Sequence, residues 1–283
     1  MNSKTENAIT RIQELQLAFS DNLKSRIDEL CLATLDLDAH LPSNSIHNAE
    51  HLKNTHDLAH KLAGSAGTFQ FNEVYAASKK LERFCHTLLE DKTPPVEDWR
   101  TQIEQLLSST KSASKHTSQS LYENQTSQQT DTRSLALSDT LSTTNKILLV
   151  DDDELLTALI QEQAKHFGYQ ITCINNPEQL PLFLEENNPE VILMDIVFPH
   201  YDFTGIDLIK RLKAENKIAC PVIFLSNRED FSARLEAVRS GGNGYIVKPI
   251  KVLELVEVLN QYTHKSINDS HRVLIIDNDP TIS

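Results

Sequence analysis

Apolar side chains in the first third of the chain recur at helical spacing. Apolar positions recur mostly every three or four residues over residues 5–38, 51–69, 72–90 and 96–107. Each segment therefore predicts an amphipathic helix with one apolar face for packing against its neighbours. Because no strand pattern occurs before residue 145, residues 1–110 are predicted to form an antiparallel four-helix bundle.

The second half of the chain alternates short apolar runs with helical patterns. The apolar runs predict five strands, at residues 146–150, 169–174, 190–194, 221–225 and 244–248. A helix is predicted after each strand, near residues 154–167, 177–186, 204–214, 229–240 and 251–262. Such alternation is typical of a doubly wound parallel sheet with right-handed crossovers and helices on both faces. The fold class is therefore α + α/β, with the α/β domain at residues 146–264.

A polar segment separates the two predicted domains. Residues 111–145 are rich in Ser, Thr and Gln and contain few apolar side chains. Such a composition cannot bury enough apolar surface to offset the entropy lost on ordering, so it predicts a flexible linker. A linker of this length spans roughly 35 Å on average, which allows the two domains to meet.

Charge and composition disfavour several classes of protein. The formal net charge is -13, which argues against nucleic-acid binding by this segment because phosphates attract a basic face. The polar N-terminus does not resemble a signal peptide, and no apolar run approaches the ~18 residues of a membrane span. The four cysteines are far apart and form no CxxC pair, which favours reduced thiols. We therefore expect a cytoplasmic protein that does not bind membranes.

The carboxyl ends of the predicted strands carry polar residues. Three aspartates, residues 151–153, follow the first strand, and Asp195 ends the third. Ser226 and Lys248 end the fourth and fifth strands. Taken alone, each acidic group would be read as part of a helix N-terminus. Because the carboxyl ends of parallel strands lie at one edge of the sheet, the cluster instead favours bound Mg²⁺, which would offset the repulsion between carboxylates.

The second predicted helix contains LAHKLAGSAGTF, residues 58–69, in which small residues follow His60. Glycine inside a helix costs about 0.5–1 kcal/mol against alanine, so Gly64 and Gly67 suggest that another group closely approaches this backbone. A phosphate-binding loop is disfavoured because the segment lacks GK[ST] and a preceding strand. A metal site at His56 and His60 is disfavoured because no third ligand has a matching spacing. A histidine without a functional role is the remaining alternative.

The string HKLAGSA, residues 60–66, resembles the H-x-L-K-G-S-A motif of histidine phosphotransfer (HPt) domains. The resemblance covers roughly residues 5–110 and implies a four-helix bundle in which an exposed histidine, His60, carries a phosphoryl group. The chemistry is reasonable because a neutral imidazole is a nucleophile near neutral pH. Ala63 replaces the lysine of the motif, and Lys61 is expected on a different side of the helix from His60.

The polar groups at the strand ends resemble the receiver domain of two-component response regulators, over about residues 146–263. This resemblance implies a flavodoxin-like (βα)5 fold with Asp195 as the phospho-acceptor. It also implies that Mg²⁺ is bound by Asp152, Asp195 and the backbone carbonyl of Val197, with Asp151 acting through a metal-bound water. In-line phosphoryl transfer needs positioning and cationic stabilisation of the phosphoryl oxygens, which Mg²⁺ and a lysine supply.

The same resemblance implies roles for three further residues. Lys248 pairs with the acceptor aspartate and then with the phosphoryl group, and its bond to Pro249 is cis in the family. Ser226 hydrogen-bonds a phosphoryl oxygen, and Tyr245 turns inward as a switch when Ser226 moves. For Tyr245, a partly buried strand aromatic without a switching role is the alternative.

Two features depart from the receiver pattern. The loop after Asp195 reads FPHYDFTG, which is about two residues longer than usual, and Asn227 stands where alanine is common. Neither departure removes a catalytic group. Both lie beside the expected phosphorylation site, so we expect them to affect partner choice or phosphoryl lifetime.

The C-terminal string HRVLIIDNDPTIS repeats the pattern that opens the receiver. Residues 271–283 are therefore expected to be the truncated first strand of a second receiver in a longer protein, since one strand cannot fold alone. Asn278 would then stand where the first receiver has Asp152.

Together the two resemblances predict a phosphorelay signalling protein and not an ordinary enzyme. His60 would carry and transfer a phosphoryl group, and Asp195 would accept it with Mg²⁺ to switch an output. The expected partners are a sensor histidine kinase, other receiver or HPt proteins, and an output domain beyond residue 283. Two alternatives are the regulatory part of a longer enzyme, such as a receiver-controlled diguanylate cyclase, and a phosphate-independent docking scaffold.

Overall fold

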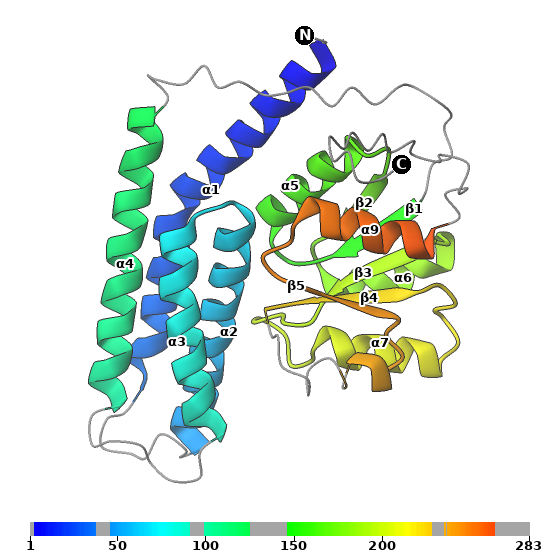
Figure 1. Ribbon diagram of the computed structural model, residues 1–283. Helices are drawn as coiled ribbons and strands as arrows, with labels where there is room; N and C mark the ends of the chain where they lie inside the picture. The colour runs from blue at the N-terminus through cyan, green and yellow to red at the C-terminus, as the bar shows by residue number, and fades with distance from the viewer. Residues whose placement is uncertain are drawn as a thin grey trace, which may run out of the picture.

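The computed structural model shows a helical bundle beside an α/β domain (Figure 1). It describes residues 3–37, 46–90, 99–124, 146–227, 235 and 237–263. Most of the helix predicted at residues 229–240 lies outside these ranges, as do the C-terminal part of the predicted linker and the repeat at residues 271–283. No helix within the described ranges is long and apolar enough to cross a membrane.

The bundle has the four helices that the apolar spacing predicted. They are α1 (Ser3–Leu35), α2 (Ile46–Thr68), α3 (Asn72–Glu90) and α4 (Trp99–Asn124). Aromatic rings hold α1 against the α2–α3 corner, because Phe19 stacks on Phe69 at 4.4 Å and meets Phe71 edge-on at 5.2 Å. Leucines from the first three helices fill the rest of this core, including Leu23, Leu30, Leu52 and Leu81.

Helix α4 continues through residues that were predicted to begin a flexible linker at residue 111. The polar composition was misleading because Ser and Thr hydroxyls can bond to the helix backbone itself. Thr110 donates to the Leu106 carbonyl at 3.0 Å, and Ser114 donates to the Lys111 carbonyl at 2.8 Å. Ala113 also packs against the bundle core, so the helix runs to Asn124.

The second domain contains a five-stranded parallel sheet. Its strands are β1 (Lys146–Val150), β2 (Gln170–Ile174), β3 (Val191–Asp195), β4 (Val222–Ser226) and β5 (Gly244–Val247). Their order, β2-β1-β3-β4-β5, is the flavodoxin-like order, so the predicted fold class is confirmed. The residues of β3 and β4 are all buried, as a central parallel strand with both faces covered requires.

Helices cover both faces of this sheet. They are α5 (Glu154–Lys165), the 3-10 turn η1 (Pro177–Gln179), α6 (Leu180–Glu186), α7 (Gly205–Ala214) and α9 (Val252–Tyr262). Apolar side chains of α6 and α7 form one core with one face of the sheet, and those of α5 and α9 form another on the opposite face. The Lys248–Pro249 peptide bond is cis.

The two domains are packed together. Leu159 of α5 belongs to the apolar core of the bundle, and Leu155 and Ala158 pack against it. Helix α2 lies along the edge of the α/β domain on the bundle side (Figure 1). Hydrogen bonds join α2 to the carboxyl ends of the strands: the Ile250 N–H donates to Thr68 Oγ1 at 3.1 Å. Helix α2, which carries His60, therefore lies at the edge of the sheet where the predicted acidic residues end their strands.

The first residue of α7 must be glycine because of a close backbone contact. A Cβ on Gly205 would lie 1.9 Å from the Asp195 carbonyl oxygen, and overpacking typically costs about 1–3 kcal/mol or more. We expect Gly205→Ala to destabilise the α/β domain by more than about 2 kcal/mol, measured from urea unfolding followed by circular dichroism. Lys210→Ala, an exposed position on the same helix, should change stability by less than about 0.5 kcal/mol. Equal stability of the two variants would contradict this constraint.

Candidate functional site

Three aspartates converge at the carboxyl edge of the sheet. Asp151 and Asp152 follow β1, and Asp195 ends β3. One carboxylate oxygen from each lies within 4.8 Å of the others. The side chains of Asp151 and Asp195 are fully buried, so the repulsion between these carboxylates is poorly screened by water. The pocket formed by these three residues is called the acidic pocket below.

Lys248 supplies one positive charge to the acidic pocket. Its Nζ lies 2.7 Å from Asp151 Oδ2 and 3.0 Å from Asp195 Oδ1. Burial opposes ionisation of Asp151, but the nearby ammonium groups of Lys248 and Lys61 hold the pKa of Asp151 below its usual range. Asp151 also accepts a hydrogen bond from the Asp153 N–H at 3.0 Å, which fixes its orientation.

A second positive charge comes from the helical bundle. Lys61 of α2 places its Nζ 3.2 Å from Asp151 Oδ1 and in contact with Asp152 and Asp195. The same ammonium lies 5.2 Å from the ring centre of Phe198, in the loop after β3. Burial lowers the pKa of Lys61, but the three carboxylates outweigh it and hold the pKa well above its usual value. Lys61 therefore stays charged inside the interface.

The donor set of the acidic pocket fits a magnesium ion. Mg²⁺ prefers oxygen ligands and is usually held by one or two carboxylates. Asp152 Oδ1 is buried and contacts the Lys61 ammonium as an ion pair, so its lone pairs already face a cation. Burial and the neighbouring carboxylates of Asp151 and Asp195 raise the pKa of Asp152, which a divalent cation would reverse.

His60 lies on α2 beside the acidic pocket and is only 1% exposed. Its Nδ1 is 3.1 Å from Glu82 Oε1 on α3, and its Nε2 is 3.5 Å from the Asn227 N–H after β4. Burial lowers the pKa of His60 more than the Glu82 carboxylate raises it, so the neutral imidazole is favoured. A proton on Nδ1, shared with Glu82, leaves the Nε2 lone pair facing the α/β domain.

His60 was expected to be exposed, but the packed α/β domain covers it. Asn227 is the residue that covers it most directly, because its amide donates to the His60 carbonyl. The Asn227 carbonyl in turn accepts a hydrogen bond from Lys79 at 2.6 Å. The residue that departs from the receiver pattern is therefore a main contact between the domains.

Asp153 forms a second anchor between the domains. It caps α5 by accepting a hydrogen bond from the Leu156 N–H at 3.2 Å. Both of its carboxylate oxygens are also bound by the guanidinium of Arg26 on α1, each at 2.7 Å, and Ser65 donates to one of them. Burial raises the pKa of Asp153, but the pairing with Arg26 holds it below its usual value.

The two glycines of α2 lie against the α/β domain. A Cβ on Gly64 would be 2.9 Å from Lys248 Cδ, and a Cβ on Gly67 would be 2.7 Å from Pro249 Cβ. A side chain at either position would push the domains apart. The expectation that another group approaches this backbone closely is confirmed.

The structure brings most of the predicted site residues together. Asp151, Asp152, Asp195 and Lys248 form the acidic pocket and its internal counter-charge. Ser226 is buried at the end of β4, where its carbonyl accepts a hydrogen bond from the Lys248 N–H at 2.7 Å. The two remaining residues are half-buried: Val197 follows β3, and Tyr245 lies on β5 against the core that faces α6 and α7.

Three functional contacts were missed by the sequence reasoning. Glu82 carried a signal, because it is an acid on the buried face of α3 beside Leu81 and Cys85. Arg26 and Phe198 carried none, because their partners lie in the other domain. Lys61 was expected on a different side of α2 from His60, but both side chains contact the α/β domain.

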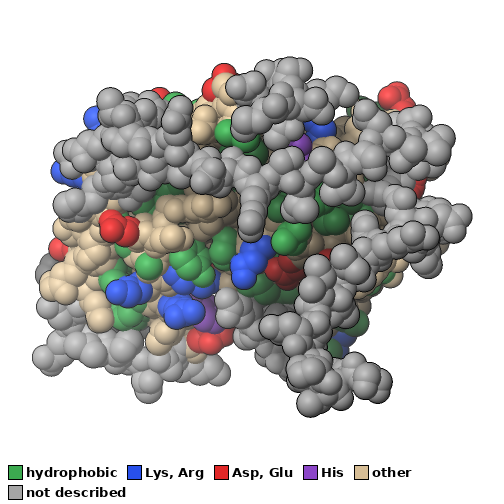
Figure 2. All heavy atoms as spheres, turned by 45° about the horizontal axis from the view of Figure 1, so that its top comes forward, with side chains coloured by type: hydrophobic (Ala, Val, Ile, Leu, Met, Phe, Trp, Pro, Cys, Tyr) green, Lys and Arg blue, Asp and Glu red, His purple; other side chains and the backbone are tan. Residues whose placement is uncertain are grey.

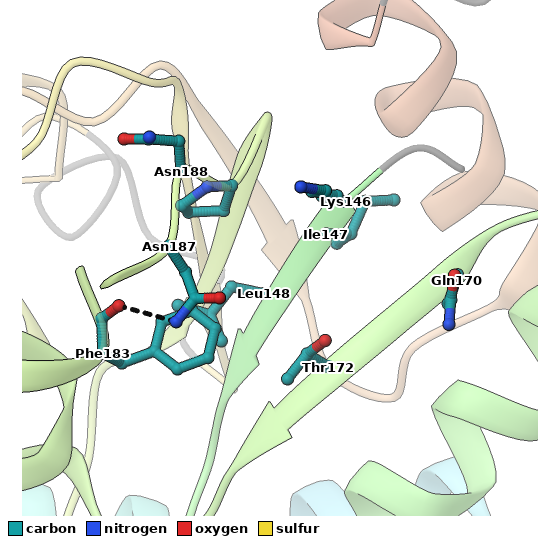
Figure 3. Close-up of a pocket in the computed structure, with 9 residues that line it drawn as sticks. Lys146, Ile147, Leu148, Gln170, Thr172, Phe183, Asn187 and Asn188 are labelled. Atoms are coloured by element: carbon teal, nitrogen blue, oxygen red, sulfur yellow. Dashed lines mark hydrogen bonds between the residues drawn. The ribbon is translucent and has the colours of Figure 1, made fainter. Parts of the chain in front are cut away.

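A pocket of about 200 Å³ lies at the opposite end of the sheet (Figure 3). It is lined by the amino-terminal parts of β1 and β2 and by the loop around Asn187 and Asn188. Asn187 already donates its amide to the Phe183 carbonyl at 3.0 Å. We assign no function to this pocket because the acidic cluster lies at the carboxyl ends of the strands.

The surface carries both signs of charge. On the described part of the face in Figure 2, basic and acidic side chains are interspersed with apolar ones. This mixture contrasts with the acidic pocket, where carboxylates are concentrated and two of the three are buried.

Two family models match the chain. Residues 7–113 match the Hpt domain, and residues 147–260 match the response regulator receiver domain. Among curated proteins, the probable transcriptional regulatory protein TcrX of Mycobacterium tuberculosis is 26% identical over 110 residues, which are 39% of this chain and 46% of TcrX. The virulence transcriptional regulatory protein PhoP of Salmonella choleraesuis is 28% identical over 111 residues, or 39% of this chain and 48% of PhoP. The chain thus spans about half the length of the curated relatives it matches.

Solved receiver domains also resemble part of the chain. A response regulator receiver domain from Francisella is 29% identical with a TM-score of 0.39, and it covers 42% of this chain and 96% of its own. The receiver domain of a sensor histidine kinase from Pseudomonas aeruginosa, solved with magnesium in its active site cleft, is 27% identical with a TM-score of 0.38. That match covers 42% of this chain and 98% of the Pseudomonas chain.

Glu82 should set both the pKa and the tautomer of His60. Because its charge and hydrogen bond raise the His60 pKa, Glu82→Gln should lower that pKa further while its amide oxygen still accepts the Nδ1 proton. Glu82→Ala should lower the pKa and also mix the two tautomers. Nitrogen NMR of the imidazole measures both properties. Glu73→Gln, an exposed position on α3, is the control, and an unchanged His60 pKa in Glu82→Gln would contradict the assignment.

Proposed function

We propose that this chain, in which an Hpt domain precedes a response regulator receiver domain, is a phosphorelay protein whose His60 and Asp195 exchange a phosphoryl group. One observation carries the proposal: consecutive residues of α2 reach the receiver, with Lys61 contacting Asp195 and His60 Nε2 facing Asn227. We place the Hpt domain at residues 1–124, which include all of α4, and the receiver at residues 146–264.

The exchange is a displacement at phosphorus between two nucleophiles. In one direction, the neutral Nε2 of His60 attacks the phosphorus of an Asp195 acyl phosphate, a P–N bond forms, and the P–O bond to the carboxylate breaks. The imidazole becomes positive because Nδ1 keeps its proton, and the Glu82 carboxylate at 3.1 Å stabilises that charge. In the reverse direction the Asp195 carboxylate attacks, and the P–N electron pair returns to Nε2.

Receiver residues position the phosphoryl group. Lys248 already contacts Asp195 and would then pair with the phosphoryl oxygens, while Ser226 at the adjacent strand end would hydrogen-bond one of them. Asp152, Asp195 and the carbonyl of Val197 would hold Mg²⁺, with Asp151 acting through a water. When bound, Mg²⁺ supplies positive charge that offsets the carboxylates and the phosphoryl oxygens. Tyr245 would report phosphorylation by moving with Ser226.

The partners follow from this chemistry. In the cytoplasm, where we place this chain, a sensor histidine kinase, or another receiver or HPt protein, would load one of the two sites. An output domain outside this chain would respond to the receiver. The Hpt–receiver interface described above supports exchange within one polypeptide, and the loops beside it would set which foreign partner competes.

Phosphate labelling tests the two acceptors. With Mg²⁺ and a small acyl phosphate donor, we expect an acyl phosphate at Asp195 followed by a phosphoimidazole at His60, both resolved by phosphorus NMR. Asp195→Asn should abolish both signals, whereas His60→Gln should retain the first and lose the second. Transfer within one chain should be first order and independent of protein concentration.

A mixture of the two variants is the control for exchange between chains. Label that appears on His60 of Asp195→Asn only when His60→Gln is added, and at the wild-type rate, would show transfer between molecules and contradict the intramolecular proposal. No label at Asp195 in the wild-type protein would contradict the receiver mechanism altogether.

The lowered pKa of His60 predicts the pH dependence of transfer. An ordinary imidazole becomes half-protonated at about pH 6.5, and its nucleophilic fraction falls below that value. Because burial shifts the His60 pKa downward, the rate of transfer from Asp195 to His60 should stay constant as the pH falls through about 6.5 and should decline only at lower pH. Single-turnover kinetics between about pH 8 and 5 measure this profile. A rate that halves near pH 6.5 would contradict it.

A further inference from the structure

Lys61 occupies the centre of the acidic pocket. Its ammonium contacts an oxygen of all three carboxylates, Asp151, Asp152 and Asp195, and the residue is only 9% exposed. These are the three carboxylates whose oxygens lie within 4.8 Å of one another and fit a divalent cation. The Lys61 ammonium and a divalent metal ion would therefore bind the same oxygens.

The charges explain why the acidic pocket attracts a cation from the Hpt domain. Among its described residues, the receiver itself provides three carboxylates and one close ammonium, that of Lys248. Lys61 reduces the remaining negative charge, and the ring of Phe198 at 5.2 Å adds a further favourable contact for its ammonium. The pocket is thus neutralised in part by a residue that arrives only when the two domains meet.

Space prevents both cations from binding at once in this arrangement. Magnesium–oxygen bonds are about 2.0–2.1 Å long, so Mg²⁺ held by Asp152 and Asp195 would fall on the Lys61 ammonium, which already contacts both carboxylates. A lysine has three donors and no acceptor, so it cannot serve as a ligand of the metal. One of the two has to leave.

We propose that Lys61 is a built-in competitor of Mg²⁺, so that docking of α2 on the receiver and divalent-cation binding weaken each other. This proposal rests on the proposed function, because it takes the acidic pocket as the magnesium site. Binding free energies are linked reciprocally. If docking with Lys61 in the acidic pocket lowers the Mg²⁺ affinity by some factor, bound Mg²⁺ lowers the docking equilibrium constant by the same factor. The docked arrangement with Lys61 in the pocket also covers the Asp195 oxygens that a phosphodonor must reach.

Other contacts hold the domains together without entering the pocket, and they supply a matched control. Lys79 donates to the Asn227 carbonyl at 2.6 Å and pairs with Glu82 at 3.0 Å. It lies in the same interface as Lys61 and carries the same charge. Lys79→Met therefore removes one partly buried ammonium from the interface while leaving the three carboxylates untouched.

Calorimetric titration of MgCl₂ into the full chain, at constant ionic strength, tests the competition. We expect Lys61→Met to bind Mg²⁺ roughly tenfold more tightly than the wild-type protein, within the range of ordinary coupling between sites. Lys79→Met leaves Lys61 in the acidic pocket, so by the same linkage it should tighten Mg²⁺ binding only as far as it weakens docking, by less than about threefold. Equal affinities for the wild type and Lys61→Met would overturn the proposal, as would equal tightening by both variants.

Amide exchange of the wild-type protein tests the structural consequence. The Ile250 N–H donates to Thr68 Oγ1 at 3.1 Å across the interface, so it reports docking. Its exchange should become faster as Mg²⁺ saturates the protein, and an unchanged rate at saturation would overturn the linkage between docking and metal binding.

Failure of this proposal can be told apart from failure of the proposed function. Neither titration nor exchange involves a phosphoryl group, so a chain that fails to label His60 can still show tighter Mg²⁺ binding in Lys61→Met. A chain in which both residues label, but Lys61→Met binds Mg²⁺ like the wild type, would keep the relay and lose the competition. No Mg²⁺ binding to either protein would overturn both proposals.

Discussion

Repulsion between three clustered carboxylates, two of them fully buried, is the constraint on which the rest of this structure depends. Asp151, Asp152 and Asp195 are brought together because β1 and β3 are neighbours in a parallel sheet, and their carboxyl ends meet at one edge. Without nearby cations, the low dielectric of the interior would drive such groups to protonate. The ionised carboxylates therefore need nearby positive charge, which Lys248 and Lys61 of the other domain supply.

Buried ion pairs are therefore expected to dominate the stability of the domain interface. Removing one partner from a buried ion pair typically costs about 3–5 kcal/mol, whereas exposed pairs contribute about 0–1 kcal/mol. The bidentate pair of Arg26 and Asp153 is largely buried, while the pair of Arg11 and Glu14 is exposed on α1. Charge pairs at the interface should therefore matter far more to docking than exposed pairs such as that of Arg11 and Glu14. Gly64 and Gly67 make these pairs possible because they let α2 approach closely.

The fold was predictable because it follows from local periodicity. Strand runs such as residues 191–195, and apolar stripes such as that of α3, identify their elements without reference to distant residues. The boundary at residue 111 was wrong because composition does not show whether a hydroxyl such as that of Thr110 will bond to its own helix. Local patterns thus determine the elements better than their ends.

The candidate site was predictable only within each domain. Asp195 and Lys248 could be placed together because the sheet fixes where parallel strands end. The contacts of Arg26 and Phe198 could not be predicted, because they depend on how the two domains pack. Hydrophobic periodicity carries no information about that packing. Asn227 was identified as unusual, but its contact with His60 required the docked arrangement.

The departure from the HPt motif and the placement of Lys61 explain each other. Residue 63 is fully buried as alanine, so a lysine there would have to displace packed neighbours. Successive helical residues point about 100° apart, which separates the direction of Lys61 from that of His60. His60 can then lie against Glu82 while Lys61 extends into the carboxylates. The positive charge of the motif has in effect moved from a position beside the histidine to a position among the carboxylates of the acidic pocket.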